Sequence, residues 1–247
     1  MNKRIISFKT IFRIDYPMAF RMLDHFGKYT EIVHRETQNS PYSDAKTNIN
    51  PMEHSVTSTA YYNSDVFRFN LSLKTLNALI EHEKGANLLE LHSHPTLTLA
   101  DKLLAHFEES SFNTLDRLGF RTWIIVSDNK FTFDKVKNAL VKLNAPLEHT
   151  LNKQIGKTED ICITFENQHD HGEYSRISLG PYREIEQNRY FSVPINIKEG
   201  FIMDIDVSQR KFEIRNLSLS KSSRYYFEQI YNIANSISNT LEELLDD

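Results

Sequence analysis

Glycine is scarce in this chain, and its scarcity limits what the chain can fold into. Only 7 of the 247 residues are glycine. Loops that cradle phosphates need several glycines close together, because the backbone must approach the phosphate groups. The chain has no G-x-G-x-x-G, no G-x-x-x-x-G-K-[ST] and no G-x-S-x-G segment. The sequence therefore argues against nucleotide-binding Rossmann and P-loop folds and against α/β-hydrolase chemistry.

The composition is that of an ordinary globular chain, with 40% apolar and 25% charged residues. The 29 basic and 33 acidic side chains give a net charge of −4, which does not indicate a nucleic-acid-binding protein. The single Cys162 excludes an intrachain disulfide and any zinc site built from two cysteines of one chain. It lies in the apolar segment 161–165, which predicts a buried strand with an inert thiol.

The start of the chain does not indicate a targeting segment. Lys9 interrupts the first apolar run far short of the core of a signal peptide. No stretch approaches the roughly 18 uncharged apolar residues that span a bilayer. We therefore expect a cytoplasmic protein without membrane contact.

Apolar spacing and turn residues predict the secondary structure. A long polar loop is expected at 36–55 and a polar connector at 144–160. The first helix is expected to stop at Gly27 and the third at Gly119. Predicted strands cover residues 4–14, 56–62, 66–71, 88–94, 120–126, 161–165, 174–179, 190–197, 201–207 and 211–219. Predicted helices cover residues 15–26, 72–85, 100–118, 134–143, 182–188 and 222–245.

Tight turns are expected at 198–200 and 208–210, and strands joined by such turns favour antiparallel pairing. The prediction is an α+β fold with mainly antiparallel sheets covered by helices, ending in a long C-terminal helix. We find no fixed-period repeat. The connector suggests an N-terminal α+β half at residues 1–150 and a C-terminal antiparallel meander plus helix at residues 151–247, unless the two form one continuous domain.

Residues 90–95 form the first candidate site. On a strand, the period of two would point Glu90, His92 and His94 to one face, where they form a ligand set for a divalent metal. The H-x-H-P pattern resembles the metal-binding strand of the JAMM deubiquitinating metalloproteases. The pattern departs from that family after His94, because the first following serine is Ser110. The alternative is a solvated strand face or the turn that enters the next helix.

Two further clusters carry titratable side chains. Residues 169–172, with sequence HDHG, predict a hairpin turn, because Asp and Gly favour turn geometry. The alternative is that this turn contacts a metal or another ligand. Asp204 and Asp206 share one face of a predicted strand, where they could bind a cation or act as a carboxylate dyad. The simpler interpretation is a solvent-facing strand whose carboxylates pair with Arg215 or Lys211 across a hairpin.

The C-terminal helix carries a narrow apolar seam. The spacing of four and three residues predicts that this seam packs on the protein's own sheet, or that it forms a dimer contact or a docking helix for a partner. The seam residues are Tyr226, Ile230, Ile233, Ile237, Leu241 and Leu244.

Basic residues surround the last predicted hairpin and form a candidate nucleic-acid contact. Such a contact would rest on charge, because most of the aromatic residues fall on core periodicities. The basic residues are Arg210, Lys211, Arg215, Lys221 and Arg224.

Two segments resemble a sporadically distributed bacterial family of uncharacterised proteins. An apolar-Asp-Ile-Asp-apolar strand lies at 202–207 and is followed by a strand at 212–219 and a final helix with Phe227. The family also has an R-x-G-L-R-Y-I-N type strand, which segment 116–125 resembles. The family has no assigned activity. Its scattered distribution implies carriage on mobile elements and a role in phage defence.

In that second segment, Arg117, Gly119 and Arg121 match the family pattern. Trp123 and Ile125 depart from it, because the pattern has Tyr and Asn there.

We expect a non-enzymatic interaction or accessory protein, because no complete catalytic set can be assembled from neighbouring residues. Its partner would be another protein or a second copy, and no cofactor is expected. One alternative is a metal-dependent hydrolase using His92 and His94, which would require a divalent metal. The other is a nucleic-acid-binding protein that uses the basic hairpin.

Overall fold

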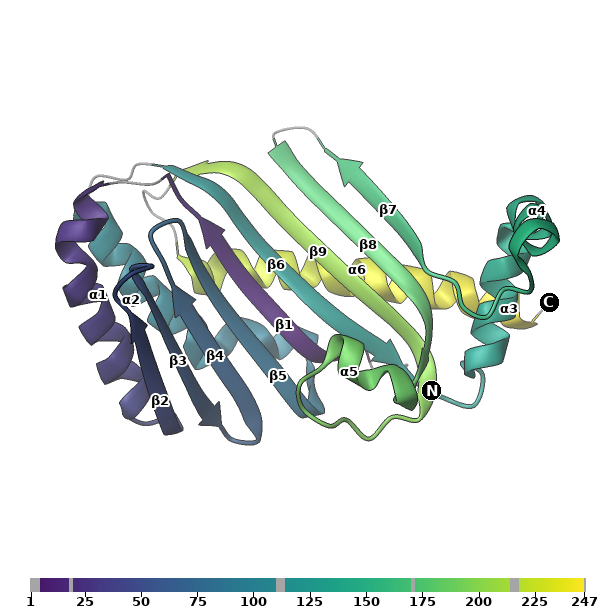
Figure 1. The fold of residues 1–247 in the computed structure, drawn as a ribbon, viewed down its shortest axis with the longest axis horizontal. Coiled ribbons are helices and arrows are strands. Elements are labelled where there is room, and N and C mark those ends of the chain that lie inside the picture. The colour runs from purple at the N-terminus through teal and green to yellow at the C-terminus, as the bar shows by residue number, and fades with distance from the viewer. Residues whose placement is uncertain (1–4, 18–19, 110–113, 170–171, 214–217, 247) are drawn as a thin grey trace.

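One antiparallel sheet of nine strands organises the molecule, and helices cover one of its faces (Figure 1). The structure, a computed structural model, describes residues 5–17, 20–109, 114–169, 172–213 and 218–246. The strand order is β2-β3-β4-β5-β1-β6-β9-β8-β7. The predicted α+β class, with antiparallel pairing and a long C-terminal helix, is confirmed.

The elements have the following bounds. The strands are β1 (Ile6–Asp15), β2 (Ser43–Asn50), β3 (Ser55–Tyr62), β4 (Asp65–Leu71), β5 (Thr75–Asn87), β6 (Thr114–Val126), β7 (Ile163–Gln168), β8 (Glu173–Arg183) and β9 (Glu199–Glu213). The helices are α1 (Phe20–Gln38), α2 (Pro95–Glu109), α3 (Phe133–Leu143), α4 (Ala145–Ile155), α5 (Gln187–Tyr190) and α6 (Leu219–Asp246). Short 3₁₀ turns are η1 (Leu88–Ser93) and η3 (Glu184–Glu186).

The two halves of the chain repeat one order of elements, although the sequence shows no fixed period. The first half runs β1, α1, the meander β2 to β5, then α2; the second runs β6, α3 with α4, the meander β7 to β9, then α6. In each half the last strand of the meander returns beside the first strand. Because β1 and β6 pair antiparallel in the sheet, the halves are related as by a twofold axis perpendicular to the sheet.

The two faces of the sheet differ in what covers them. Helices α1, α2 and α6 lie over one face (Figure 1) and enclose the main core. On the other face, a smaller apolar cluster lies beneath residues 190–197, which we call the strap. That cluster contains Phe8, Trp123, Ile125, Tyr182, Phe191, Ile195 and Ile202. The rest of this face has no helix over it in Figure 1.

Helix α6 is the longest helix and runs behind the middle of the sheet (Figure 1). Phe227 and Ile230 are buried on the side that faces the sheet. No helix in the described part of the chain is both long enough and apolar enough to cross a membrane.

Several predicted elements are confirmed. These are the hairpin at 56–71, the buried strand at 120–126, the helix at 134–143, the short helical piece near 182–188 and the C-terminal helix. They are the segments in which apolar spacing and turn residues agree.

The first helix is longer than predicted. It continues to Gln38 through Gly27, where the prediction ended it. Gly27 is exposed, and a Cβ there would meet no atom within 4 Å, so nothing at this position forces a turn. The predicted loop at 36–55 is also wrong, because β2 forms within it and pairs with β3.

Residues 72–85 form a strand rather than the predicted helix. In β5, Leu76, Ala78 and Ile80 are buried, whereas Asn77 and Leu79 point to the opposite face. Gly85, which was predicted to close a helix, lies inside the strand with a φ of 73°.

The next two predicted elements are also wrong in part. The extended segment at 88–94 is the turn η1, because the side chain of Asn87 accepts a hydrogen bond from the backbone N–H of Leu89. The helix predicted over 100–118 ends at Glu109 as α2, and Leu115 and Leu118 are buried in β6.

Four predictions in the second half need correction. The polar connector contains α4. Cys162 precedes β7 and is exposed, so it is not a buried strand residue. The turn predicted at 208–210 does not exist, because β9 is one continuous strand paired with β6 and β8. The strand predicted at 190–197 is the strap, which lies outside the sheet.

Candidate functional site

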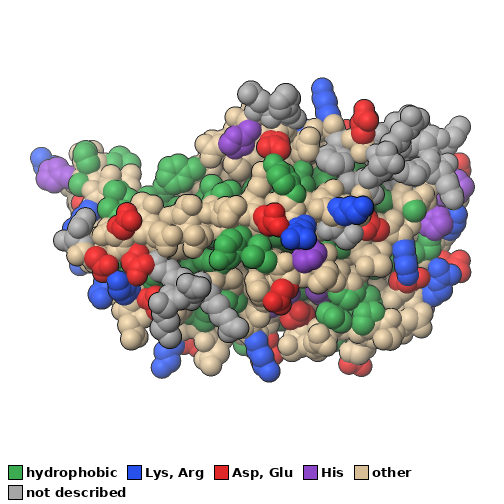
Figure 2. All heavy atoms as spheres, turned by 180° about the vertical axis from the view of Figure 1, so that it is seen from behind, with side chains coloured by type: hydrophobic (Ala, Val, Ile, Leu, Met, Phe, Trp, Pro, Cys, Tyr) green, Lys and Arg blue, Asp and Glu red, His purple; other side chains and the backbone are tan. Residues whose placement is uncertain are grey.

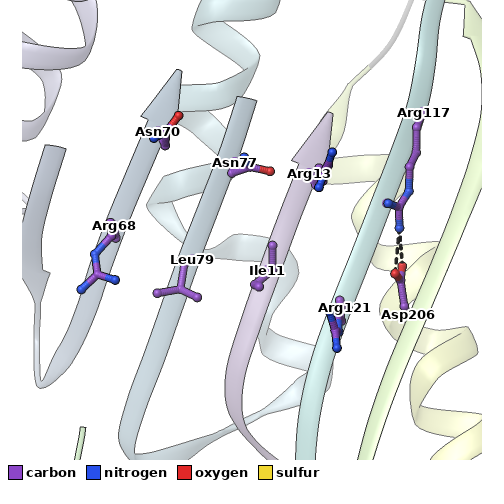
Figure 3. Close-up of a pocket in the computed structure, with 10 residues that line it drawn as sticks. Ile11, Arg13, Arg68, Asn70, Asn77, Leu79, Arg117, Arg121 and Asp206 are labelled. Carbon is purple, nitrogen blue, oxygen red and sulfur yellow. Dashed lines mark hydrogen bonds and ion pairs between the residues drawn. The ribbon is translucent and has the colours of Figure 1, made fainter. Parts of the chain in front are cut away.

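The face of the sheet opposite the helices carries a cluster of arginines. Figure 3 shows side chains from β4, β5, β1, β6 and β9 on this face, with the helices behind the strands. They line an open pocket of about 350 Å³, which we call the arginine face. Its lining residues are Ile11, Arg13, Arg68, Asn70, Asn77, Leu79, Arg117, Gly119, Arg121 and Asp206.

Strand register explains why these residues meet. Arg68 lies opposite Leu79, which lies opposite Ile11, which lies opposite Arg121. The two arginines are thus separated by three strand spacings, roughly 14 Å, with an apolar floor between them. The next row along the strands contains Asn70, Asn77 and Arg13.

Two ion pairs join β6 to β9 at one side of the pocket. Arg121 donates from Nε and Nη2 to the two carboxylate oxygens of Asp204, at 2.7 and 2.5 Å. Arg117 donates from Nη2 to both oxygens of Asp206, at 2.8 and 2.7 Å (Figure 3). The bidentate pair of Arg121 with Asp204, which uses two nitrogens, fixes the orientation of that guanidinium plane. The hydrogen bond to Asp204 also raises the pKa of Arg121.

These contacts revise the interpretation of the two aspartates. They share one face of a strand, as predicted, but their partners are Arg117 and Arg121 of β6. The predicted partner Arg215 lies outside the described residues. The two segments that carry the family resemblance therefore lie on adjacent strands and are joined by these ion pairs.

Gly119 allows the Arg117 side chain to lie close to the sheet. A Cβ at this position would stand 3.1 Å from Nε of Arg117 and 3.1 Å from Cβ of Ser208. Contacts that close are tighter than ordinary packing, so a larger residue would push the guanidinium away. The glycine thus helps to set the height of Arg117 above the strands.

The other two arginines are more available to a ligand. Arg13 donates from Nε to Asp15 at 2.7 Å, but 45% of its side chain remains exposed. Arg68 is exposed and forms no ion pair with a carboxylate in the described part of the chain. These two side chains line the pocket from β1 and β4 (Figure 3).

Trp123 borders the pocket on the side of the strap. Lys9 Nζ lies 5.0 Å and the guanidinium carbon of Arg121 lies 4.4 Å from the centroid of its ring. Only 7% of Trp123 is exposed. The ring therefore supports the two cations and offers little surface for stacking on another aromatic group.

The lining suits binding better than catalysis. Guanidinium groups match carboxylate and phosphate oxygens, and the two asparagine amides can donate and accept hydrogen bonds. Among the described residues, those that line the pocket include no serine, cysteine, histidine or lysine. Their one carboxylate, Asp206, is held by Arg117. The pocket therefore lacks an activated nucleophile with its general base.

The residues proposed for metal binding do not form a site. In η1, His92 Nδ1 lies 2.7 Å from the carbonyl oxygen of Leu89, and Glu90 accepts a hydrogen bond from Asn87. His94 lies beyond the turn and is buried. The strand geometry that would align the three side chains is absent, because residues 88–93 form a 3₁₀ turn. Within the described ranges, no group of three or more His, Cys, Asp or Glu side chains could hold a metal ion.

His94 instead belongs to the core, and this makes stability sensitive to acid. Its Nδ1 accepts a hydrogen bond from the backbone N–H of Thr96, and its ring packs edge-on against Tyr62. Burial, with a smaller effect of the nearby His82, lowers the pKa of His94 from 6.5 to about 4. His94 therefore binds a proton more weakly in the folded protein than in the unfolded chain.

We expect His94 to destabilise the fold by about 3 kcal/mol when the pH falls from 7 to below 4. The loss should begin near pH 6.5, where the unfolded chain binds the proton, and end near pH 4. Urea titrations across this range would measure it. His94→Asn keeps an acceptor for Thr96 and does not titrate, so its free energy of unfolding should depend less on pH. An equal pH dependence in wild type and variant would contradict the assignment.

The seam of α6 mainly packs inside the molecule. Tyr226, Ile230 and Leu241 are buried in the core, and Ile233 and Ile237 are partly buried against it. This agrees with the simpler of the two interpretations, packing on the protein's own sheet. A partner contact of the seam remains a prediction. Ile237 and Leu244 of the seam are partly exposed.

Of the remaining candidate residues, Arg210 lies directly opposite Arg117 in the pairing of β9 with β6, at the border of the arginine face, but it does not line the pocket. Arg210 and Lys211 are exposed near the end of β9, and Lys221 and Arg224 are exposed on α6. The predicted hairpin that would bring these basic residues together is absent over the described residues. Arg215 lies outside these residues. In the histidine cluster, His169 is exposed and residues 170–171 are not described.

Sequence reasoning missed the arginine face as a unit. The available signal was the period of two in R-x-D at Arg13, R-x-N at Arg68 and R-x-G-x-R at Arg117, which points these side chains to one face of each strand. Their convergence depends on strand order, which no local pattern reveals.

No protein-family model, curated protein or solved structure matches the chain.

Proposed function

We propose that the protein is a non-enzymatic interaction protein whose arginine face binds an acidic segment of a partner protein. The observation that carries this proposal is Arg68, an exposed guanidinium without a carboxylate partner in the described chain, aimed at a pocket that three further arginines line. The family resemblance implies an accessory role in a mobile-element or phage-defence system. Binding an acidic segment of a partner would serve such a role.

The pocket chemistry favours a peptide over a nucleic acid. Proteins that bind single strands usually stack bases on exposed aromatic rings, and the residues that line this pocket are not aromatic. By contrast, an acidic peptide could place a carboxylate on Arg68, an apolar side chain on Ile11 and Leu79, and backbone groups on the asparagine amides.

Reversing charge on Arg13 and Arg68 should weaken this binding. The probe is a fluorescein-labelled peptide of Glu-Ala-Ile repeats, and the readout is fluorescence anisotropy at low ionic strength. Losing two charge-assisted hydrogen bonds should weaken the affinity of Arg13→Glu/Arg68→Glu by about tenfold or more. Both side chains are substantially exposed, so the variant should remain folded.

A matched control separates a specific site from general charge attraction. Lys135→Glu/Lys153→Glu changes the net charge equally but alters exposed residues of α3 and α4. It should keep wild-type affinity. Equal loss in both variants, no binding by the wild type, or tighter binding of a single-stranded oligonucleotide than of the peptide would overturn the proposal.

A further inference from the structure

The two edges of the sheet are protected differently. At the β2 edge, the register with β3 shifts between Ser43 and Lys46, and Asp44 has a φ of 50°. Bulges and charged side chains of this kind hinder pairing with another chain. At the β7 edge, the register with β8 is continuous through all six residues. The outer backbone groups of β7 therefore form a regular and unblocked template for a further strand.

An apolar groove lies directly beneath this open edge. It has a volume of about 280 Å³ and runs between β7, β8, α3 and the C-terminal part of α6. Phe165 of β7 lines it and is 51% exposed. In the first half of the chain, α1 packs against β2 and β3, whereas its counterpart α3 packs mainly against β8 and β9. The second half thus lacks the helix cover that its edge strand would need.

Helix α4 presents a second uncovered apolar surface at the same end. Leu147 and Leu151 lie one turn apart on α4 and are 60% and 42% exposed. In Figure 1, α4 projects beyond the β7 edge of the sheet. Figure 2, seen from behind, shows exposed hydrophobic side chains at this end of the molecule as well as elsewhere on the same face. Because these leucines remain exposed, α4 does not fill the groove of its own chain.

We infer that two copies of this chain pair through β7, with each α4 lying against the groove of the other copy. A twofold axis at the β7 edge covers the groove and the α4 leucines of both copies. Helix α4 projects past this edge, so it must meet any copy that pairs with β7. A partner of another kind would need to supply both a strand and a leucine ridge in the same geometry.

The charges of β7 are compatible with pairing to itself. Its only charged side chain is Glu166, whose carboxylate lies 3.5 Å from Nε of Arg176. An antiparallel register that centres Phe165 on its counterpart places Glu166 opposite Thr164, so like charges do not meet. The same register brings the two Phe165 rings together over the grooves, where an aromatic pair adds to the buried area.

The mass of the protein in solution tests this inference. Multi-angle light scattering after size exclusion, at micromolar concentration, should give twice the mass of one chain. Phe165→Lys and Leu147→Glu/Leu151→Glu should each yield monomers, because they place charges in the groove or on the ridge. Ile49→Lys is the matched control: Ile49 is 50% exposed on β2 at the other edge, and this variant should remain dimeric. A monomeric wild type, or dimers that survive both interface variants, would overturn the inference.

The single cysteine gives an independent check of geometry. Cys162 is exposed and immediately precedes β7. In the proposed register, the two Cys162 Cα atoms lie roughly 20 Å apart. Paired spin labels should report a distance in this range, and a signal without a defined intermolecular distance would contradict the register. The monomeric variants should still bind the acidic peptide, so the two proposals can fail separately.

Discussion

Phe120→Ala should lower the free energy of unfolding by about 3–5 kcal/mol, the range for removing a fully buried aromatic ring. Phe120 lies in the middle of β6 with no exposed surface. Its ring centroid lies 5.2 Å from that of Phe12 on β1 and 5.1 and 5.2 Å from those of Tyr226 and Phe227 on α6. This ring therefore joins both halves of the sheet to the longest helix, and its removal leaves a cavity that none of these elements can fill alone.

Urea unfolding followed by circular dichroism would measure the loss. Phe120→Leu should be less destabilising, because it retains most of the apolar volume. Tyr225→Ala serves as the control: Tyr225 is adjacent on α6 but 50% exposed, and its truncation should change stability by about 0.5 kcal/mol or less. If Phe120→Ala were no more destabilising than the control, the two halves would not depend on this contact.

The fold class could be predicted because hairpins and amphipathic helices leave local signals. One failed prediction, the helix over residues 72–85, was caused by the arginine face. In β5, Leu79 is an apolar residue on the open side, so it completed a false helical spacing with Leu76 and Ile80. Its actual role is to form part of the pocket floor between Arg68 and Arg121. A residue that serves a surface site can thus break the alternation by which a strand is recognised.

The long strand β9 was missed for a related reason. Ser208 and Gln209 read as a turn, yet Ser208 is buried where β9 faces Gly119 of β6. A small hydroxyl fits there because the neighbouring strand has no side chain. The small side chain of Ser208 is matched to Gly119, which lies 89 positions earlier in the chain. Local sequence propensity therefore cannot reveal it.

The ion pairs of the candidate site show the same limit. Both motifs were recognised separately, R-x-G-x-R in one segment and D-x-D in another, but only the two aspartates were assigned to one face of a strand. The contacts Arg117–Asp206 and Arg121–Asp204 join residues 89 and 83 positions apart. Predicting them requires the knowledge that β6 and β9 are neighbours, which follows from the repeated order of elements in the two halves.

The strap is attached to the sheet through one buried carboxylate. Glu81 has no exposed surface and accepts hydrogen bonds from the backbone N–H and the hydroxyl of Ser192 at 2.9 and 2.6 Å. Lys9 Nζ lies 3.5 Å from the same carboxylate and donates to the carbonyl oxygen of Tyr190 at 2.7 Å. These contacts hold residues 190–197 over the smaller apolar cluster, which includes Phe191 and Ile195.

Glu81→Ala should therefore release the strap and lower the free energy of unfolding by about 3–5 kcal/mol, as expected when one partner of a buried ion pair is removed. The variant leaves Lys9 without its carboxylate at the border of the arginine face. Hydrogen exchange should show protection of residues 190–197 falling by about a hundredfold, while that of β3 and β4 changes less. Glu83→Ala alters an exposed carboxylate of the same strand and should leave the strap protected. Wild-type protection in Glu81→Ala would mean that apolar contacts alone hold the strap, and that the carboxylate is not its anchor.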